Sequence, residues 1–347
     1  MQLLEQLIGT QLGLVLAFAV TAAVVVLAGI RLSVYGDALG DRTGLGSGLV
    51  GLIFLAAVTS LPELVVSLTS VLQNSNLVQG ADLATGNMLG SNVFNLLILA
   101  LMALLFPSKF KTQKLDNPHT ASTVYGLILL AIFALAFAVA RNAGGLIPGL
   151  QCSWATLLLP IAYGFILHRE HRQHTEPEIK EVLPTEQALA QQPAPRFYSV
   201  LGVLCGLIIL GGISLSILGS RMALPPEQGG FGLEASLIGT VFLAISTSLP
   251  ELVISFASVR MGFLDMAVGN VLGSNMFNLL IIFAADIALR GGNLLAYASS
   301  KHWTSVGLIL LLTLLAGLLL RTRKPAATLA TAIVMVTAYI LALILIL

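Results

Sequence analysis

The sequence predicts an all-α integral membrane protein in which about ten transmembrane helices form two inverted five-helix repeats. Three observations support this fold class: the composition, the number of long apolar stretches, and two motifs that occur once in each half. Of the 347 residues, 57% are hydrophobic and 10% are charged, and the mean hydropathy is +0.95. Soluble domains carry about 25% charged residues, so a multi-span membrane protein fits best. The net charge of +1 gives no indication of nucleic-acid binding.

Ten stretches are apolar enough to cross a bilayer, which takes about 20 residues. They are residues 9–32, 44–72, 82–106, 122–141, 146–168, 197–219, 232–260, 265–289, 302–321 and 325–347. The sizeable polar segment, residues 169–196, contains four prolines and is expected to be a linker. It divides the chain into a first half, residues 1–168, and a second half, residues 197–347.

Lysine and arginine are distributed unevenly between the two sides of the predicted membrane. With the N-terminus outside, the inside loops carry thirteen of these residues and the outside loops carry four. Cytoplasmic loops carry the excess of positive charge. The sequence therefore predicts that both termini lie outside and that the linker 169–196 is cytoplasmic. The compact loops favour a prokaryotic inner membrane.

A glutamate follows a proline in the middle of an apolar stretch in each half. The string TSLPE occurs at residues 59–63 and again at 247–251. A charged side chain at the centre of a membrane helix costs about 2.5–3.5 kcal/mol on insertion scales. Duplication kept only for packing would need an apolar pattern, not matched Thr, Ser, Pro and Glu. The repeated carboxylate therefore indicates an ion pathway.

A second string follows each glutamate: GNMLGSNVFNLL at 86–97 and GNVLGSNMFNLL at 269–280. The i, i+4 spacing places Ser91 with Asn95, and Ser274 with Asn278, on one helix face. Hydrogen bonding between helices is the alternative interpretation of the two asparagines. The strings also contain glycines four residues apart, which let helices approach closely. These glycines are Gly86, Gly90, Gly269 and Gly273.

The two copies are predicted to cross the membrane in opposite directions, because five spans separate Glu63 from Glu251. In transporters, such inverted repeats place the substrate site near the midplane, where the halves meet. The glutamate motifs are 188 residues apart and the second strings are 183 apart. The first copy thus has five extra residues, expected in the outside loop around 73–81.

The residue types around the glutamates form an oxygen-only site. Pro62 and Pro250 are expected to kink or break their helices and free carbonyl oxygens at Val58 and Ser246. Adjacent hydroxyl groups add further ligands, from Thr59, Ser60, Thr247 and Ser248. Oxygen ligands suit calcium, magnesium, sodium and potassium and disfavour zinc and copper.

Other polar residues have local interpretations. Asp82 and Asp265 match between the halves, but each lies at the start of a helix, where the dipole explains an acid as well as function does. Asp286 is expected to pair with Arg290 one turn later. No histidine lies at mid-span, so no histidine proton relay is expected.

The paired strings resemble the alpha-repeats of the calcium/cation antiporter superfamily, and specifically the prokaryotic sodium/calcium exchangers. The resemblance places the alpha-repeats at about 44–106 and 232–289, and the ten-span plan extends it over the chain. It implies a core of the second, third, seventh and eighth helices, against which the first and sixth slide. It also implies the metal ligands Glu63, Glu251, Asn95, Asn278, Thr59, Ser60, Thr247, Ser248, Ser91 and Ser274, with the carbonyls of Ala56 and Ala244.

The resemblance implies exchange of sodium for calcium across the bilayer by alternating access, in an electrogenic cycle. Ca²⁺ and Na⁺ are then transported substrates, with no cofactor and no catalytic residue. A proton/calcium or other divalent cation antiporter with the same glutamates is the alternative, and a cation channel is a further one. Potassium-dependent exchangers, and some prokaryotic ones, carry an aspartate at the position of Asn278. The amide in this chain removes a possible third acid and argues against potassium co-transport. The chain lacks the GxGD, GxSG and HExxH motifs of intramembrane proteases, which argues against an enzyme. The oligomeric state stays open.

Overall fold

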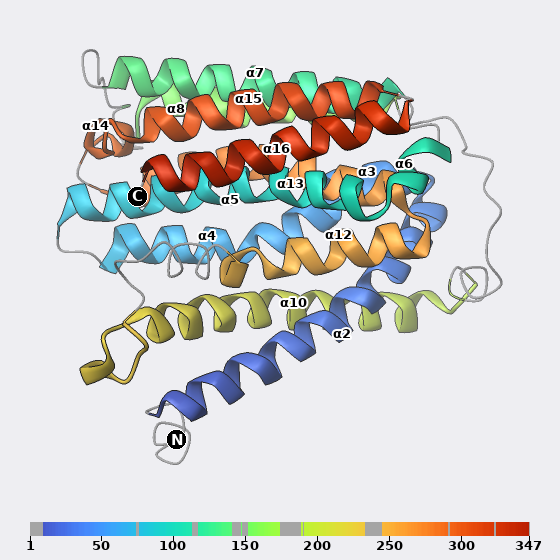
Figure 1. Ribbon diagram of the computed structural model, residues 1–347, viewed down its shortest axis with the longest axis horizontal. Coiled ribbons are helices and arrows are strands. Elements are labelled where there is room, and N and C mark those ends of the chain that lie inside the picture. The colour runs from blue at the N-terminus through green and yellow to red at the C-terminus, as the bar shows by residue number, and fades with distance from the viewer. Residues whose placement is uncertain are drawn as a thin grey trace.

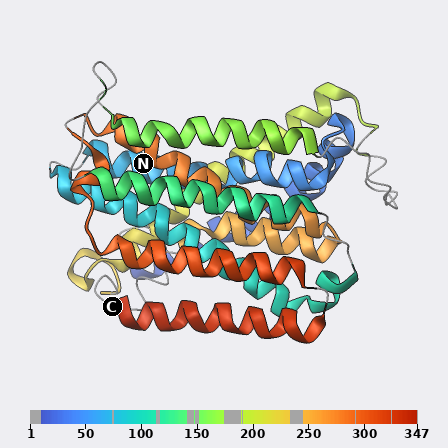
Figure 2. The same cartoon turned by 90° about the horizontal axis from the view of Figure 1, so that it is seen from above.

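The computed structural model describes residues 10–73, 76–112, 117–140, 147, 152–173, 189, 191–232, 245–290, 292–322 and 324–346. The long helices lie side by side along one axis, as Figures 1 and 2 show. Eight helices in the described part are long and apolar enough to cross a membrane. This confirms the predicted all-α membrane fold.

The first half contains seven α-helices and a π-helix in its described part. They are α2 (Gln11–Thr43), α3 (Gly46–Leu49), the π-helix η1 (Val50–Leu55), α4 (Ala56–Gln73), α5 (Leu77–Leu105), α6 (Pro107–Thr112), α7 (Asn117–Ala140) and α8 (Trp154–Gln173). The fifth predicted span corresponds to α8, and α6 is a short helix between the third and fourth spans.

The second half follows the same plan. Its described elements are α10 (Ala194–Ala223), the 3₁₀ turn η2 (Pro226–Gln228), α12 (Leu249–Met261), α13 (Leu264–Ala288), α14 (Leu294–Tyr297), α15 (His302–Arg321) and α16 (Pro325–Ile346). The seventh predicted span, 232–260, ends in α12, and its residues 233–244 lie outside the described part.

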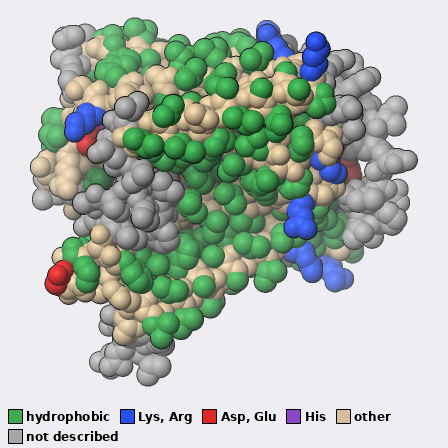
Figure 3. Space-filling model, in the orientation of Figure 1, with side chains coloured by type: hydrophobic (Ala, Val, Ile, Leu, Met, Phe, Trp, Pro, Cys, Tyr) green, Lys and Arg blue, Asp and Glu red, His purple; other side chains and the backbone are tan. Residues whose placement is uncertain are grey.

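The outer surface of the bundle is apolar. Leu12, Leu27 and Leu210 each expose about two thirds of their area, at 69%, 67% and 66%. In Figure 3, hydrophobic side chains cover the middle of the visible face, and most visible Lys and Arg side chains lie toward one end. Exposed leucines suit contact with lipid. The predicted orientation depends on the uneven distribution of Lys and Arg between the two ends.

The centre of the bundle depends on direct backbone contact between η1 and α13. A Cβ atom added at Gly273 would meet the carbonyl oxygen of Leu52, and one added at Gly269 would meet that of Gly48. A Cβ at Gly51 would meet the carbonyl of Met266. The close approach expected from the glycine pair of α13 is therefore confirmed.

Helices α2 and α10 cross the core on one side (Figure 1). A Cβ at Gly212 of α10 would lie 2.5 Å from the ring of Pro62 and 3.1 Å from the ring of Pro250. On α2, a Cβ at Gly29 would lie 2.7 Å from Val253. Each crossing helix thus presents a glycine where it passes over the core.

The two prolines affect their helices differently. In the second half, the helix is interrupted at Ser248 (φ −101°, ψ 20°), and α12 restarts with Pro250 in its first turn, where no N–H partner is needed. In the first half, α4 continues through Pro62. Its irregularity is the π-helix η1, which shifts the hydrogen-bond register ahead of α4. The helix is therefore interrupted next to Pro250, whereas Pro62 does not break α4.

The five extra residues of the first copy mostly lengthen a helix. Helices α4 and α12 both end ten residues after their glutamate. However, α5 begins nine residues before Gly86, whereas α13 begins five residues before Gly269. Four of the five residues thus add one turn to the start of α5. The expectation that they enlarge the loop was wrong.

Asp286 joins three elements near the C-terminal end of α13. Its Oδ2 accepts hydrogen bonds from the Ser153 N–H (2.7 Å) and the Thr156 hydroxyl (2.5 Å), and its Oδ1 accepts one from the Leu294 N–H (2.7 Å). The expected pair with Arg290 is wrong, because α13 ends at Ala288 and Arg290 has a left-handed backbone (φ 43°).

The backbone contact at Gly273 predicts a specific cost for one methyl group. Gly273→Ala should destabilise the protein by about 1–3 kcal/mol, because the packed backbone has to move. Gly307 of α15 has open space around it. Gly307→Ala is the matched control and should be neutral or stabilising by up to about 1 kcal/mol. Thermal unfolding of both variants in detergent measures the difference, and equal melting temperatures would contradict the backbone contact.

Candidate cation-binding site

Two carboxylates from different halves lie buried at the centre of the bundle. Glu63 lies near the middle of α4, and Glu251 lies in the first turn of α12. Both side chains are 0% exposed. Two acids in this setting need polar partners, because an unpaired buried charge is strongly unfavourable.

Each glutamate receives a hydrogen bond from the opposite half. The Ser60 hydroxyl donates to Oε1 of Glu251 and the Ser248 hydroxyl donates to Oε1 of Glu63, both at 3.2 Å. These four residues occupy equivalent places in the two TSLPE strings. The reciprocal bonds bring both motifs into one site, as an inverted repeat predicts.

Hydroxyl groups of the second strings also contact the TSLPE string of the opposite half. The hydroxyl oxygens of Thr59 and Ser274 lie 3.3 Å apart, and the Ser248 hydroxyl lies 3.4 Å from that of Ser91. The Ala56 carbonyl accepts a bond from the Thr59 hydroxyl at 3.3 Å. All five residues are buried. The site is therefore lined by oxygen atoms from α4, α5, α13 and the start of α12.

Several polar atoms of the site lack a hydrogen-bond partner in the described structure. They are Oε2 of Glu63, Oε2 of Glu251, both amide atoms of Asn95, and Oδ1 of Asn278. Buried polar atoms are nearly always bonded. Four of these five atoms are oxygens, the ligand type that hard cations prefer. The arrangement is suited to holding such a cation.

Neither a thiolate nor an imidazole joins this arrangement. In the described part of the chain, no group of three or more His, Cys, Asp or Glu residues could hold a metal ion. The donors are two carboxylates supplemented by hydroxyl and amide oxygens. This set favours calcium or sodium over zinc or copper.

The contacts given above do not include two of the predicted ligands, Thr247 and Ala244. Thr247 is half-buried and lines a cavity of about 610 Å³ between the C-terminal halves of α4 and α10. Thr69, Ser70 and Ser216 also line this cavity. Ala244 lies outside the described residues.

The sequence reasoning missed two asparagines that support the glutamate helices. The Asn87 amide donates to the Glu63 carbonyl at 3.4 Å and to the Ser67 hydroxyl at 3.1 Å. The Asn270 amide donates to the Ser255 hydroxyl at 3.0 Å. Both asparagines follow the first glycine of the repeated strings, so their repetition was the available signal.

Three further asparagines join the two second strings. The Asn278 amide donates to Oδ1 of Asn92 at 3.1 Å, and the Asn275 amide donates to the Asn92 carbonyl at 3.3 Å. Asn278 thus bonds across the halves through its nitrogen, which leaves its Oδ1 for the site. Asn278 therefore forms the interhelical hydrogen bond that was considered as an alternative, and its Oδ1 still has no partner in the described structure.

The chain matches one protein family along most of its length. A family model described as sodium/calcium exchanger protein matches residues 13–168 and 198–347. The inner membrane protein YrbG of Escherichia coli (strain K12) is 30% identical over 285 residues, which cover 80% of this chain and 79% of that protein. The sodium/calcium exchanger MaX1 of Methanosarcina acetivorans is 24% identical over 314 residues, covering 80% of this chain and 85% of that protein.

The same fold occurs in a solved structure. The sodium-calcium exchanger NCX_Mj, soaked with Na⁺ and Sr²⁺, superposes with a TM-score of 0.66 at 19% identity. The match covers 95% of this chain and 98% of that chain. At this level of identity, the likeness shows a shared fold.

Asn92 accepts a hydrogen bond from Asn278, whereas the amide of Asn95 has no partner in the described structure, so truncation of the two residues should affect the stability of the ion-free protein differently. Asn92→Ala removes an acceptor and leaves the buried Asn278 amide unpaired, which should cost about 1–3 kcal/mol. Asn95→Ala removes two unpartnered polar atoms and should leave the melting temperature unchanged or higher. Thermal unfolding in calcium-free and sodium-free buffer tests this. A larger loss for Asn95→Ala than for Asn92→Ala would contradict the assigned hydrogen bonds.

Proposed function

Because this chain belongs to the sodium/calcium exchanger protein family, we propose that it is an antiporter that exchanges sodium for calcium by alternating access. The observation that carries this proposal is the pair of fully buried glutamates, each bonded to a serine of the opposite half and each with an unpartnered oxygen. The proposed ligands are Glu63 and Glu251 with the surrounding hydroxyl and amide oxygens. Ca²⁺ and Na⁺ are the transported substrates.

The charge of the site explains why the two ions would exchange. Two ionised glutamates give the site a charge near −2, which one calcium ion neutralises. Calcium accepts six to eight oxygens in irregular geometry, and the interrupted helix at Ser248 supplies such a setting. Sodium ions compete for the same oxygens. Competition alone is then enough to make loading with one ion require release of the other.

The same charge also explains the coupling of movement to binding. Enclosing two uncompensated carboxylates in a low-dielectric interior is strongly unfavourable. A site without a cation would therefore resist closure, whereas a neutralised site could close and reopen on the other side. In this mechanism α2 and α10, which cross the core over Pro62, Pro250 and Val253, are the helices that slide.

Energetics favour three sodium ions for each calcium ion. With a potential of about 100 mV, a sodium gradient of about tenfold and a calcium gradient of about 10⁴-fold, each sodium supplies about 3.7 kcal/mol. Export of one calcium then costs about 10 kcal/mol. Two sodium ions fall short and three suffice. The proposed cycle is therefore electrogenic.

Proton-coupled exchange of calcium or another divalent cation is the runner-up, since the same two carboxylates could carry protons. We place the protein in a prokaryotic inner membrane with both termini outside and the linker 169–196 in the cytoplasm. The bias of Lys and Arg toward the predicted inside loops supports this orientation.

Calcium uptake into sodium-loaded proteoliposomes tests the function directly. Wild-type protein should take up calcium only with an outward sodium gradient, and Glu63→Gln and Glu251→Gln should each abolish uptake because they remove a charge from the site. Glu227→Gln, which alters an exposed glutamate of η2, is the matched control and should retain uptake. Uptake driven by a pH gradient without sodium would instead support proton coupling.

The proposed stoichiometry predicts a response to membrane potential. Three sodium ions leaving for each calcium entering carry one net positive charge out of the vesicle. An inside-positive potential, set with external potassium and valinomycin, should therefore accelerate uptake, and an inside-negative one should slow it. Rates that are indifferent to potential would support an electroneutral two-to-one cycle.

A further inference from the structure

Two histidine–aspartate pairs lie outside the cation site, and each joins the two halves of the chain. Nε2 of His302 lies 2.8 Å from Oδ1 of Asp82, and Nε2 of His119 lies 2.8 Å from Oδ1 of Asp265. The two aspartates are 183 residues apart, and so are the two histidines. This is also the offset of the repeated GSN strings, so the two pairs are the same contact in inverted copies.

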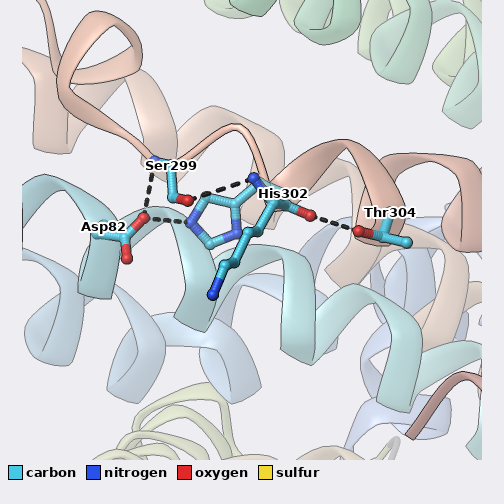
Figure 4. Close-up of polar contacts among 5 residues, drawn as sticks. Asp82, Ser299, His302 and Thr304 are labelled. Carbon is cyan, nitrogen blue, oxygen red and sulfur yellow. Dashed lines mark hydrogen bonds and ion pairs between the residues drawn. The ribbon is translucent and has the colours of Figure 1, made fainter. Parts of the chain in front are cut away.

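Each pair connects the start of a central helix to the start of a peripheral helix. Asp82 lies in the second turn of α5 and meets the first residue of α15, as Figure 4 shows. Asp265 lies in the first turn of α13 and meets His119 in the first turn of α7. Asp82 also accepts the Ser299 N–H at 2.8 Å.

The pairs lie at opposite ends of the bundle. The start of α5 and the end of α13 both contact the segment around α14, through Ser299 and Leu294 respectively. Helices α5 and α13 therefore run in opposite directions, and the start of α13 lies at the far end (Figure 1). Each end of the molecule thus carries one pair, which joins α5 to α15 at one end and α13 to α7 at the other.

Each aspartate lies five residues before an asparagine that supports a glutamate helix. A Cβ at Gly86 would lie 3.3 Å from Cε1 of His302, and the next residue, Asn87, donates to the Glu63 carbonyl. In the other half, Asn270 lies five residues after Asp265 and donates to Ser255, one turn after Glu251.

The interpretations considered for these acids from sequence do not account for the pairing. A helix dipole favours an acid at Asp82 or Asp265 but requires no histidine at a matched position. A metal centre would need a further ligand, and no group of three His, Cys, Asp or Glu residues occurs in the described part. A repeated contact between a central and a peripheral helix remains to be explained.

We propose that the two histidine–aspartate pairs are positioning residues that hold α5 and α13 in register against α15 and α7. Through Asn87 and Asn270, this register sets the place of the two glutamate helices and therefore the geometry of the cation site. The His119–Asp265 pair has the greater effect, because its side chains are 5% and 16% exposed, against 14% and 43% for His302 and Asp82. Only the transport readout of this proposal rests on the proposed function.

Reciprocal exchange of one pair tests the proposal. His119→Ala and Asp265→Ala should each raise the KM for calcium about three- to tenfold, the equivalent of one lost hydrogen bond. The combined exchange His119→Asp with Asp265→His restores the contact in reverse and should return the KM to within about twofold of wild type. His119→Gln keeps an N–H donor and should also retain most of the affinity.

His168→Ala, which alters an exposed histidine of α8, is the matched control and should leave the KM unchanged. The proposal is overturned if the single variants lower only the melting temperature at unchanged KM, or if the exchange and the glutamine variant are no better than the alanine variants. Should an alanine variant fail to fold, the glutamine variant and the more exposed His302–Asp82 pair give the same comparison.

A readout without transport separates this proposal from the proposed function. Loss of either pair should speed hydrogen exchange of backbone amides around Asn87 or Asn270 in the ion-free protein. If wild type neither transports calcium nor is stabilised by it, the function is wrong, while exchange still reports on the pairs. Unchanged exchange in both alanine variants of a pair would overturn the positioning role.

Discussion

The burial of two carboxylates in an apolar bundle is the constraint on which the rest of the structure depends. Neither half can satisfy its own glutamate, because the serine that donates to Glu63 belongs to the second half and the one that donates to Glu251 belongs to the first. The halves therefore have to interpenetrate at the centre. The contacts that allow this are glycines at the points of closest approach, such as Gly273 against Leu52 and Gly212 against Pro62.

A broken or irregular helix is the second requirement of such a site. A regular helix uses its carbonyl oxygens in its own hydrogen bonds and offers few of them to an ion. An interrupted helix leaves carbonyl oxygens available, and within a membrane this is tolerated only where protein or water surrounds them. In the described part of the chain, a π-helix precedes α4, and the helix is interrupted at Ser248 just ahead of α12. The identical TSLPE strings thus adopt two conformations in one structure.

The sequence predicted the elements of the fold better than the contacts between them. Hydropathy located the spans because lipid imposes a length and a polarity on each helix, and the repeated strings located the glutamates and their serines. Contacts between residues far apart in the chain leave little local signal. Asp286 was therefore assigned to nearby Arg290, although its partners Ser153 and Thr156 lie more than 100 residues away. Asn87 and Asn270 were overlooked because the hydrogen bonds of an amide side chain depend on the residues of the neighbouring helix, which the sequence does not reveal.

The different conformations of the two halves have a consequence for transport. The cavity that reaches Thr247 lies between α4 and α10, and the inverted repeat relates these helices to α12 and α2. At the equivalent place, Gly29 of α2 lies against Val253 of α12, so this side is packed. If the halves exchanged conformations, the cavity would close between α4 and α10 and open between α12 and α2, at the opposite end of the bundle. In the proposed mechanism, two similar sequences in two conformations would supply the two states that alternating access requires.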